Sequence, residues 1–215
     1  MDAETAIALA HDVDERLGRQ IAFLLEIDQL KQVLRRTSIA SGERRENSAE
    51  HSWHLALLAT TLAEHAAEPV DVATVVRMVL VHDIVEVDAG DTFVYADDPD
   101  KDAREAAAAE RIFGLLPEPA ATDLRATWEA FEAGSSPEAR FARALDRLQP
   151  MLLNWVNGGG PWVEHGIPAT RVREINGRID DGAPTLWALA DRLIDGAVTA
   201  GAIAASDPAP PAQPR

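Results

Sequence analysis

The chain has 215 residues, with 20 Lys and Arg against 36 Asp and Glu, and a formal net charge of −16 at pH 7. A protein that binds DNA or RNA as a polymer needs a basic surface to neutralise phosphates, so a nucleic-acid polymer is not expected as a partner. The absence of cysteine excludes disulfides and thiolate ligands, which leaves nitrogen and oxygen donors for any metal. We find no basic leader followed by an apolar run and no stretch of roughly 18 apolar residues, so we expect a soluble, cytoplasmic protein without a membrane partner.

The composition favours an all-α fold. Ala, Leu and charged residues dominate, whereas aromatic residues make up 5% of the chain. We expect one helical domain over residues 1–204, followed by a Pro- and Ala-rich tail over 205–215 that is disordered.

The first part of the chain combines two predicted helices with a basic segment. Apolar residues recur at helical spacing over 4–10 and 13–34. A polar segment, 35–47, follows and includes a Ser-Gly pair that indicates a turn. This segment contains four arginines: Arg35, Arg36, Arg44 and Arg45. It is either a solvated connection or the place where an acidic protein binds an anion.

Two helices that carry unusual polar residues come next. One is predicted over 48–67, with Ser48 as its N-cap, and contains His51. The other starts at 69–71 and enters the stretch 81–92, where an apolar pattern suddenly carries His82 and Asp83. Burying such groups costs free energy unless something binds them, and a metal ion is the natural partner.

The remaining sequence is also helical in pattern. Helices are predicted over five further ranges: 101–116, 122–132, 137–157, 169–180 and 184–204. Ser136 can cap the third of these and Pro137 can open it, while Pro150 inside it predicts a kink or local break. We find no convincing strand pattern, so a single helical bundle is the simplest interpretation.

Four residues from separate predicted helices form a candidate metal site: His51, His82, Asp83 and Asp146. Two imidazoles and two carboxylates suit Mn²⁺, Fe²⁺, Co²⁺, Ni²⁺ or Zn²⁺ better than Ca²⁺. Four protein ligands on an ion that accepts six leave two positions for water and substrate, which is a catalytic arrangement. Taken singly, each residue also has an ordinary interpretation: a core histidine for His51, and a surface acid paired with Arg143 or Arg147 for Asp146.

The order of these residues resembles the H…HD…D signature of the HD-domain phosphohydrolase superfamily. The match is closer to its 5′-deoxynucleotidase branch: Glu46-Asn47-Ser48-Ala49-Glu50-His51-Ser52, then His82-Asp83 with Glu86 and Gly90-Asp91, then Phe141-Ala142-Arg143-Ala144-Leu145-Asp146. The resemblance implies an all-α HD-domain bundle that holds one divalent transition metal ion on His51, His82, Asp83 and Asp146.

The resemblance also implies roles for residues beside the metal. Glu86 would exchange protons with the water that the metal holds or with the leaving oxygen. Asp91 would orient water or contact the sugar. Arg36, fifteen residues before His51, matches the position of the family arginine that contacts substrate phosphate, with Arg35, Arg44 and Arg45 as helpers.

The implied activity is hydrolysis of (deoxy)nucleoside 5′-monophosphates by a homodimer. The family usually has a Trp soon after the phosphate arginine, whereas this chain has Thr37-Ser38-Ile39, which bears on substrate preference rather than reaction type. Two alternatives therefore stay open: a phosphatase for another small phosphorylated metabolite, and an HD-fold sensor that binds nucleotide without turnover.

Overall fold

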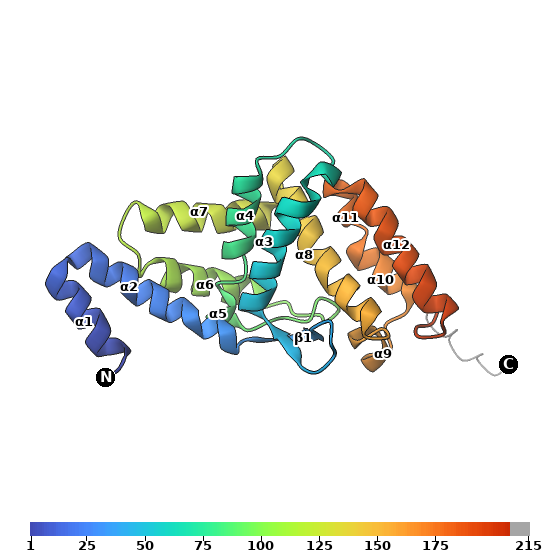
Figure 1. Cartoon of the computed structure of the whole chain (residues 1–215), viewed down its shortest axis with the longest axis horizontal. Helices are drawn as coiled ribbons and strands as arrows, with labels where there is room; N and C mark the ends of the chain where they lie inside the picture. The colour runs from blue at the N-terminus through green and yellow to red at the C-terminus, as the bar shows by residue number, and fades with distance from the viewer. Residues whose placement is uncertain (207–215) are drawn as a thin grey trace.

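The computed structural model describes residues 1–206 (Figure 1). The predicted disordered tail lies, from residue 207 onward, outside the described residues. The elements follow one another in this order: α1 (Ala3–Val13), α2 (Glu15–Ile27), the 3₁₀ helix η1 (Asp28–Gln32), β1 (Leu34–Ser38), β2 (Arg45–Asn47), α3 (Ser48–Leu62), the 3₁₀ helix η2 (Ala63–His65), α4 (Val72–Val81), α5 (Glu86–Ala89), α6 (Lys101–Phe113), α7 (Ala120–Ala133), α8 (Pro137–Val156), α9 (Pro161–Glu164), α10 (Ala169–Asn176), α11 (Ile179–Gly182) and α12 (Pro184–Thr199).

The expected all-α fold class is confirmed, with one small sheet that the sequence pattern did not reveal. Residues predicted as a turn form a hairpin, in which β1 and β2 pair antiparallel with Leu34 opposite Asn47 and Ser38 opposite Arg45. Side chains alternate between the two faces of a strand. Arg35 is accordingly half-buried, whereas its neighbour Arg36 is exposed.

Two helix boundaries differ from the predicted ones, and both concern the candidate site. The helix that carries His82 ends at Val81, with His82 as its C-cap, and a turn leads into the short α5. The break predicted at Pro150 is wrong, because α8 continues from Pro137 to Val156. Proline has no N–H, so the carbonyl of Asp146, four residues earlier, still loses its usual helical hydrogen bond.

Helices α3, α4 and α8 pack together at the centre of the molecule (Figure 1). Their buried residues belong to two apolar clusters. Val75, Met78 and Val79 of α4 lie in the larger cluster, which includes α3, α8 and α12, whereas Val81 and Ile84 lie in the smaller cluster with α6 and α7. The His82-Asp83 pair therefore sits where the two cores meet, and packing from both sides fixes its backbone.

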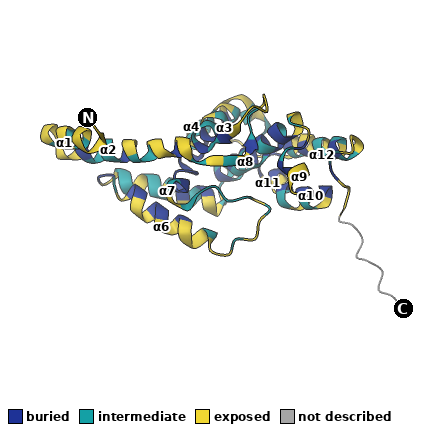
Figure 2. Cartoon of the chain, turned by 90° about the horizontal axis from the view of Figure 1, so that it is seen from below, coloured by how far each residue is buried: buried dark blue, intermediate teal, exposed yellow. Residues whose placement is uncertain are grey.

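Helices α1 and α2 form an arm that extends from the centre (Figures 1 and 2). None of the residues of α1 is buried, and Leu9 and Val13 are 63% and 77% exposed. Within residues 1–206, no helix combines the length and apolar character that crossing a membrane requires.

Candidate active site

The structure brings the four predicted metal ligands together. Nε2 of His51 lies 2.9 Å from Oδ1 of Asp146, and Nε2 of His82 lies 3.0 Å from Oδ1 of Asp83 and 3.6 Å from Oδ1 of Asp146. Donor atoms about 2.1 Å from one ion are separated by about 3.0 Å at right angles and about 4.2 Å across it. The observed separations match this range.

The two histidines are oriented as metal ligands. Nδ1 of His82 donates to the carbonyl of Val79 (2.9 Å), and Nδ1 of His51 donates to Oε1 of Gln149 (3.1 Å). Fixing the proton on Nδ1 leaves a lone pair on Nε2, as metal-binding imidazoles require. Nε2 of His82 is buried and makes no hydrogen bond within the described residues. A divalent ion among these four side chains would satisfy it.

A buried network that the sequence pattern did not identify supports His51. Nε2 of Gln149 donates to Oε1 of Glu46 (2.7 Å) and faces Nδ1 of His54 at 3.2 Å. The His54 ring also lies beside Trp53, with ring centroids 6.1 Å apart. Gln149 follows Asp146 by three residues, so helical spacing alone places it on the same face.

Of the four candidate phosphate arginines, Arg35 lies deepest in the site. Its Nη1 donates to Oδ2 of Asp83 (2.9 Å) and lies 3.7 Å from Oδ1 of Asp91, while its buried Nε has no hydrogen-bond partner among the described residues. Arg36 lines the same cavity from an exposed position.

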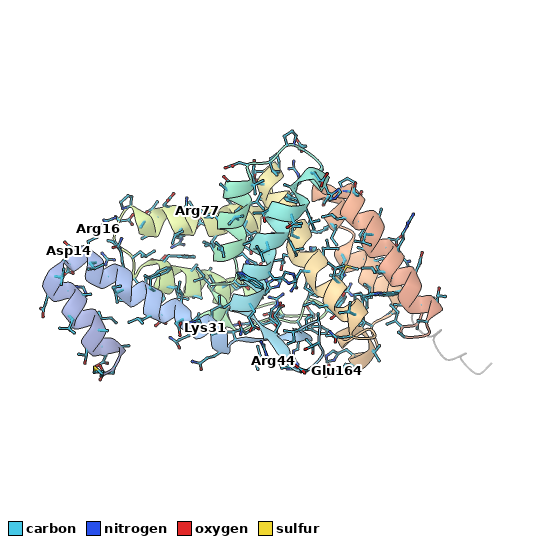
Figure 3. The ribbon with its side chains drawn as sticks, viewed as in Figure 1. Asp14, Arg16, Lys31, Arg44, Arg77 and Glu164 are labelled. Carbon is cyan, nitrogen blue, oxygen red and sulfur yellow. The ribbon has the colours of Figure 1, made fainter. Side chains whose placement is uncertain are left out.

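Arg44 and Arg45 lie elsewhere. Arg44 forms two hydrogen bonds with Glu50, at 2.7 and 2.8 Å, and lies at the outside of the molecule beside the hairpin (Figure 3). Glu50 in turn closes the capping box of α3 with Asn47, which is the N-cap in place of the predicted Ser48. Arg45 is exposed, and neither arginine is among the residues that line the cavity.

Glu86 and Asp91 both face the cavity. The Ser48 hydroxyl donates to Oε2 of Glu86 (2.6 Å). Burial raises the pKa of Glu86 well above its usual value, and the Asp83 charge adds to this, while Arg35 acts in the opposite direction. Burial likewise raises the pKa of Asp91, opposed by Arg35. A carboxyl with a raised pKa keeps its proton to higher pH than an ordinary carboxyl and can then donate it.

The charges of the ligands depend on one another. Burial alone would raise the pKa of Asp146, but the adjacent His51 and His82 side chains hold it well below the usual value. Burial would lower the pKa of His82, but Asp83 and Asp146 raise it well above the usual value. A metal ion bound by His82 would have to displace a proton from it, so we expect metal binding to weaken at acidic pH.

The site opens into a cavity of about 360 Å³. One face of α8 lines it with six residues at helical spacing: Arg143, Asp146, Arg147, Pro150, Met151 and Asn154. Tyr95 also lines the cavity, and its hydroxyl accepts from Nε1 of Trp162 (3.1 Å) and Nδ2 of Asn176 (3.0 Å). The segment around Trp162 is thus part of the cavity wall.

Fold and site together define an all-α protein with a buried His/Asp cluster that could hold a metal ion. The HD domain family matches residues 27–187. The chain therefore belongs to the HD domain family.

The chain is also similar in sequence to individual proteins. The 5′-deoxynucleotidase HDDC2 of Homo sapiens is 32% identical over 135 residues, which cover 61% of this chain and 65% of that protein, and the protein of Mus musculus is 31% identical over 61% and 66%. The chain thus spans just under two thirds of these curated relatives.

Solved structures are similar over more of the chain. A predicted metal-dependent phosphohydrolase from Magnetospirillum magnetotacticum MS-1 is 50% identical, with a TM-score of 0.84, over 88% of this chain and 96% of that one. The PH0347 protein from Pyrococcus horikoshii OT3 is 23% identical, with a TM-score of 0.56, over 80% and 99%, and supports the fold alone.

Proposed function

We propose that the protein is a metal-dependent phosphomonoesterase that hydrolyses (deoxy)nucleoside 5′-monophosphates. The observation that carries this proposal is the convergence of His51, His82, Asp83 and Asp146 on one centre, in a cavity that also holds a buried arginine and a carboxyl with a raised pKa. The names of the relatives HDDC2, a 5′-deoxynucleotidase, and of the phosphohydrolase structure support it.

The four ligands would hold one divalent transition metal ion. Such an ion supplies Lewis-acid stabilisation of phosphate charge and lowers the pKa of bound water. Glu46 and Gln149 hold the His51 ring in position for it.

Arg35 and Arg36 would bind the substrate phosphate. Arg35 has a free Nε donor, and Asp83 already fixes its guanidinium through Nη1. A prepositioned guanidinium loses less conformational entropy when it binds an oxyanion. Arg36, at the exposed edge, would complete the clamp. Since Arg44 and Arg45 lie outside the cavity lining, we do not assign them this role.

Glu86 would give a proton to the oxygen that leaves with the nucleoside. Its raised pKa keeps it protonated at pH values where an ordinary glutamate is ionised, and Ser48 holds the carboxyl in place. Asp91, 3.7 Å from Arg35, would orient water or contact the sugar.

The end of the cavity near Asn154 suits the nucleoside. Asn154 lies eight residues beyond Asp146, or about 12 Å along α8. Oδ1 of Asn154 is a buried acceptor without a partner in the described residues. The Tyr95 oxygen accepts two hydrogen bonds, which leaves its own hydrogen free to donate. Such separated polar groups favour a substrate with a base over a bare sugar phosphate.

The test is release of inorganic phosphate by metal-stripped protein resupplied with Mn²⁺, Co²⁺, Mg²⁺ or Zn²⁺. Substrates would include deoxyribo- and ribonucleoside 5′-monophosphates and deoxyribose 5-phosphate. We expect hydrolysis of the nucleotides, loss of metal and activity together in Asp83→Asn, and retained metal with about 100-fold lower kcat in Glu86→Gln. Hydrolysis of sugar phosphates alone would favour another metabolite as substrate, and no hydrolysis with any metal would favour a nucleotide sensor.

We also propose that the protein is a cytoplasmic homodimer. The exposed apolar side chains Leu9 and Val13 on the α1–α2 arm support a contact with a second copy. Sedimentation of the chain and of Leu9→Lys would test the dimer, with a shift to monomer expected for the variant.

A further inference from the structure

A second hollow, of about 160 Å³, lies next to the catalytic cavity, between the end of α7, the face of α8 and the α10–α11 region. Four arginines line it, together with Glu132 and Asp181: Arg140, Arg143, Arg147 and Arg178. We call these four arginines and the space between them the arginine pocket. Such a concentration of positive charge is unexpected in a chain with a net charge of −16.

The positive charges are only partly neutralised. Arg140, Arg143 and Arg147 follow one another at spacings of three and four residues, which places like charges on one face of α8. Glu68 lies 2.5 Å from Arg140, and Glu132 lies 3.7 Å from Arg143. Within residues 1–206, neither Arg147 nor Arg178 has a carboxylate oxygen within 4.0 Å.

Arg147 has few partners for its guanidinium group. Its Nη1 donates to the carbonyl of Ile175 (2.9 Å), and its remaining donors make no hydrogen bond within the described residues. Arg143 and Arg178, which line the same hollow, carry the same charge as Arg147. A bound anion would relieve this repulsion.

We propose that the arginine pocket binds a phosphate group. Guanidinium groups present pairs of N–H donors that match the oxygens of phosphate. The pocket has less than half the volume of the catalytic cavity, which suits a single small anion. The group would come either as free inorganic phosphate or as part of a nucleotide.

The position of the pocket gives this binding a consequence for turnover. Arg143 and Arg147 line both hollows, and Arg147 directly follows Asp146. An anion held between them would neutralise positive charge at the wall of the catalytic cavity and so weaken its attraction for a phosphorylated substrate. This effect, unlike the binding itself, rests on the proposed function, and predicts that phosphate raises the KM for the nucleotide.

Arg178 allows the test, because it is exposed and does not line the catalytic cavity. Titration calorimetry with inorganic phosphate would compare the wild type with Arg178→Ala, Arg178→Lys and the control Arg192→Ala, which removes an exposed arginine from α12. Each protein would be measured both metal-loaded and metal-stripped. Urea midpoints would verify that the variants fold equally well.

We expect wild-type protein to retain one phosphate-binding event after metal removal. Arg178→Ala should weaken this event about tenfold, Arg178→Lys less, and Arg192→Ala not at all. Binding that disappears with the metal, or that is equally strong in Arg178→Ala, would overturn the proposal, as would equal losses in Arg192→Ala. Repeating the titration of the metal-stripped proteins with dAMP distinguishes the source. Similar affinity for both ligands indicates free phosphate, whereas tighter dAMP binding that is lost in Arg178→Ala indicates a nucleotide.

Because this titration involves no turnover, it can fail while the hydrolase activity holds, and the activity can fail while the pocket binds phosphate. Inhibition of nucleotide hydrolysis, if present, should be relieved in Arg178→Ala and unchanged in Arg192→Ala.

Discussion

Gln149 offers the sharpest test of how the site is held together. It is fully buried and links three groups: Nδ1 of His51 at 3.1 Å, Oε1 of Glu46 at 2.7 Å and Nδ1 of His54 at 3.2 Å. Gln149→Met keeps a flexible side chain of similar size but removes these hydrogen bonds. The His51 N–H and a buried carboxylate oxygen would lose their partners.

A buried neutral group left without a partner costs about 1–3 kcal/mol and a charged one costs more, so we expect a loss of about 4 kcal/mol in the free energy of unfolding. This is a large part of the 5–15 kcal/mol typical of folded proteins. With a slope of about 2 kcal/mol per molar urea, the unfolding midpoint should fall by about 2 M. Because His51 loses its orienting partner, metal affinity should also fall by roughly 10- to 100-fold.

Urea unfolding followed by circular dichroism measures the first effect, and titration of metal-stripped protein with Co²⁺, followed by its visible spectrum, measures the second. Gln29→Met, the same change at an exposed position, is the matched control. If Gln149→Met bound Co²⁺ as tightly as wild type, the role of the network in positioning His51 would be refuted, even if stability had dropped.

Three further predictions address other parts of the site. Arg35→Lys should lower kcat/KM for a nucleotide about 100-fold, because Arg35 is held in place by its hydrogen bond to Asp83. Arg36 lacks such a hydrogen bond within the described residues, so Arg36→Lys should lower kcat/KM by less than about tenfold. Equal losses for the two variants in steady-state kinetics would contradict this. Because the pKa of Glu86 is raised in the folded state, its protonation stabilises the fold at low pH. This contribution to the free energy of unfolding is lost as pH rises through the folded-state pKa. Urea unfolding across pH should show this loss for metal-stripped wild type and not for metal-stripped Glu86→Gln. Saturation with metal should raise the Tm of wild type by about 10 °C and leave His82→Ala unchanged in a thermal scan, whereas equal shifts would exclude His82 as a ligand.

Most of the helical fold could be predicted because its signals are local. Asp71 and Ser136 accept hydrogen bonds from the first turns of α4 and α8, as cap residues do, and Pro137 opens α8. The hairpin was missed because three- and five-residue strands give too little alternation to recognise. That omission matters, because alternation along β1 is what places Arg35 deep in the site and leaves Arg36 at its exposed edge.

The candidate site could be predicted in its residue types but not in its supporting contacts. His51, the His82-Asp83 pair and Asp146 carry signals in their spacing and resemblance to a family. Glu46 and Gln149 meet across 103 residues of chain, and Ser48 reaches Glu86 across 38. Such contacts depend on how α3 and α8 are rotated against each other, and helical periodicity gives the buried face of each helix without giving their relative position.

The charge around the cavity gives a physical reason for both the metal and the protonated carboxyl. Five carboxyl groups face or border this centre: Glu46, Asp83, Glu86, Asp91 and Asp146. Arg35 is the buried cation that lies within 4.0 Å of four of them, and it cannot neutralise them all. Several uncompensated buried charges would be very costly. A divalent cation would neutralise two of these negative charges, and a proton on Glu86 would neutralise a third. The excess of buried negative charge therefore favours both metal binding and a protonated Glu86 beside the substrate. Removing a carboxylate from this group should therefore lower the pKa of Glu86. We expect Asp83→Asn to lose metal binding and to have a lower Glu86 pKa than wild type.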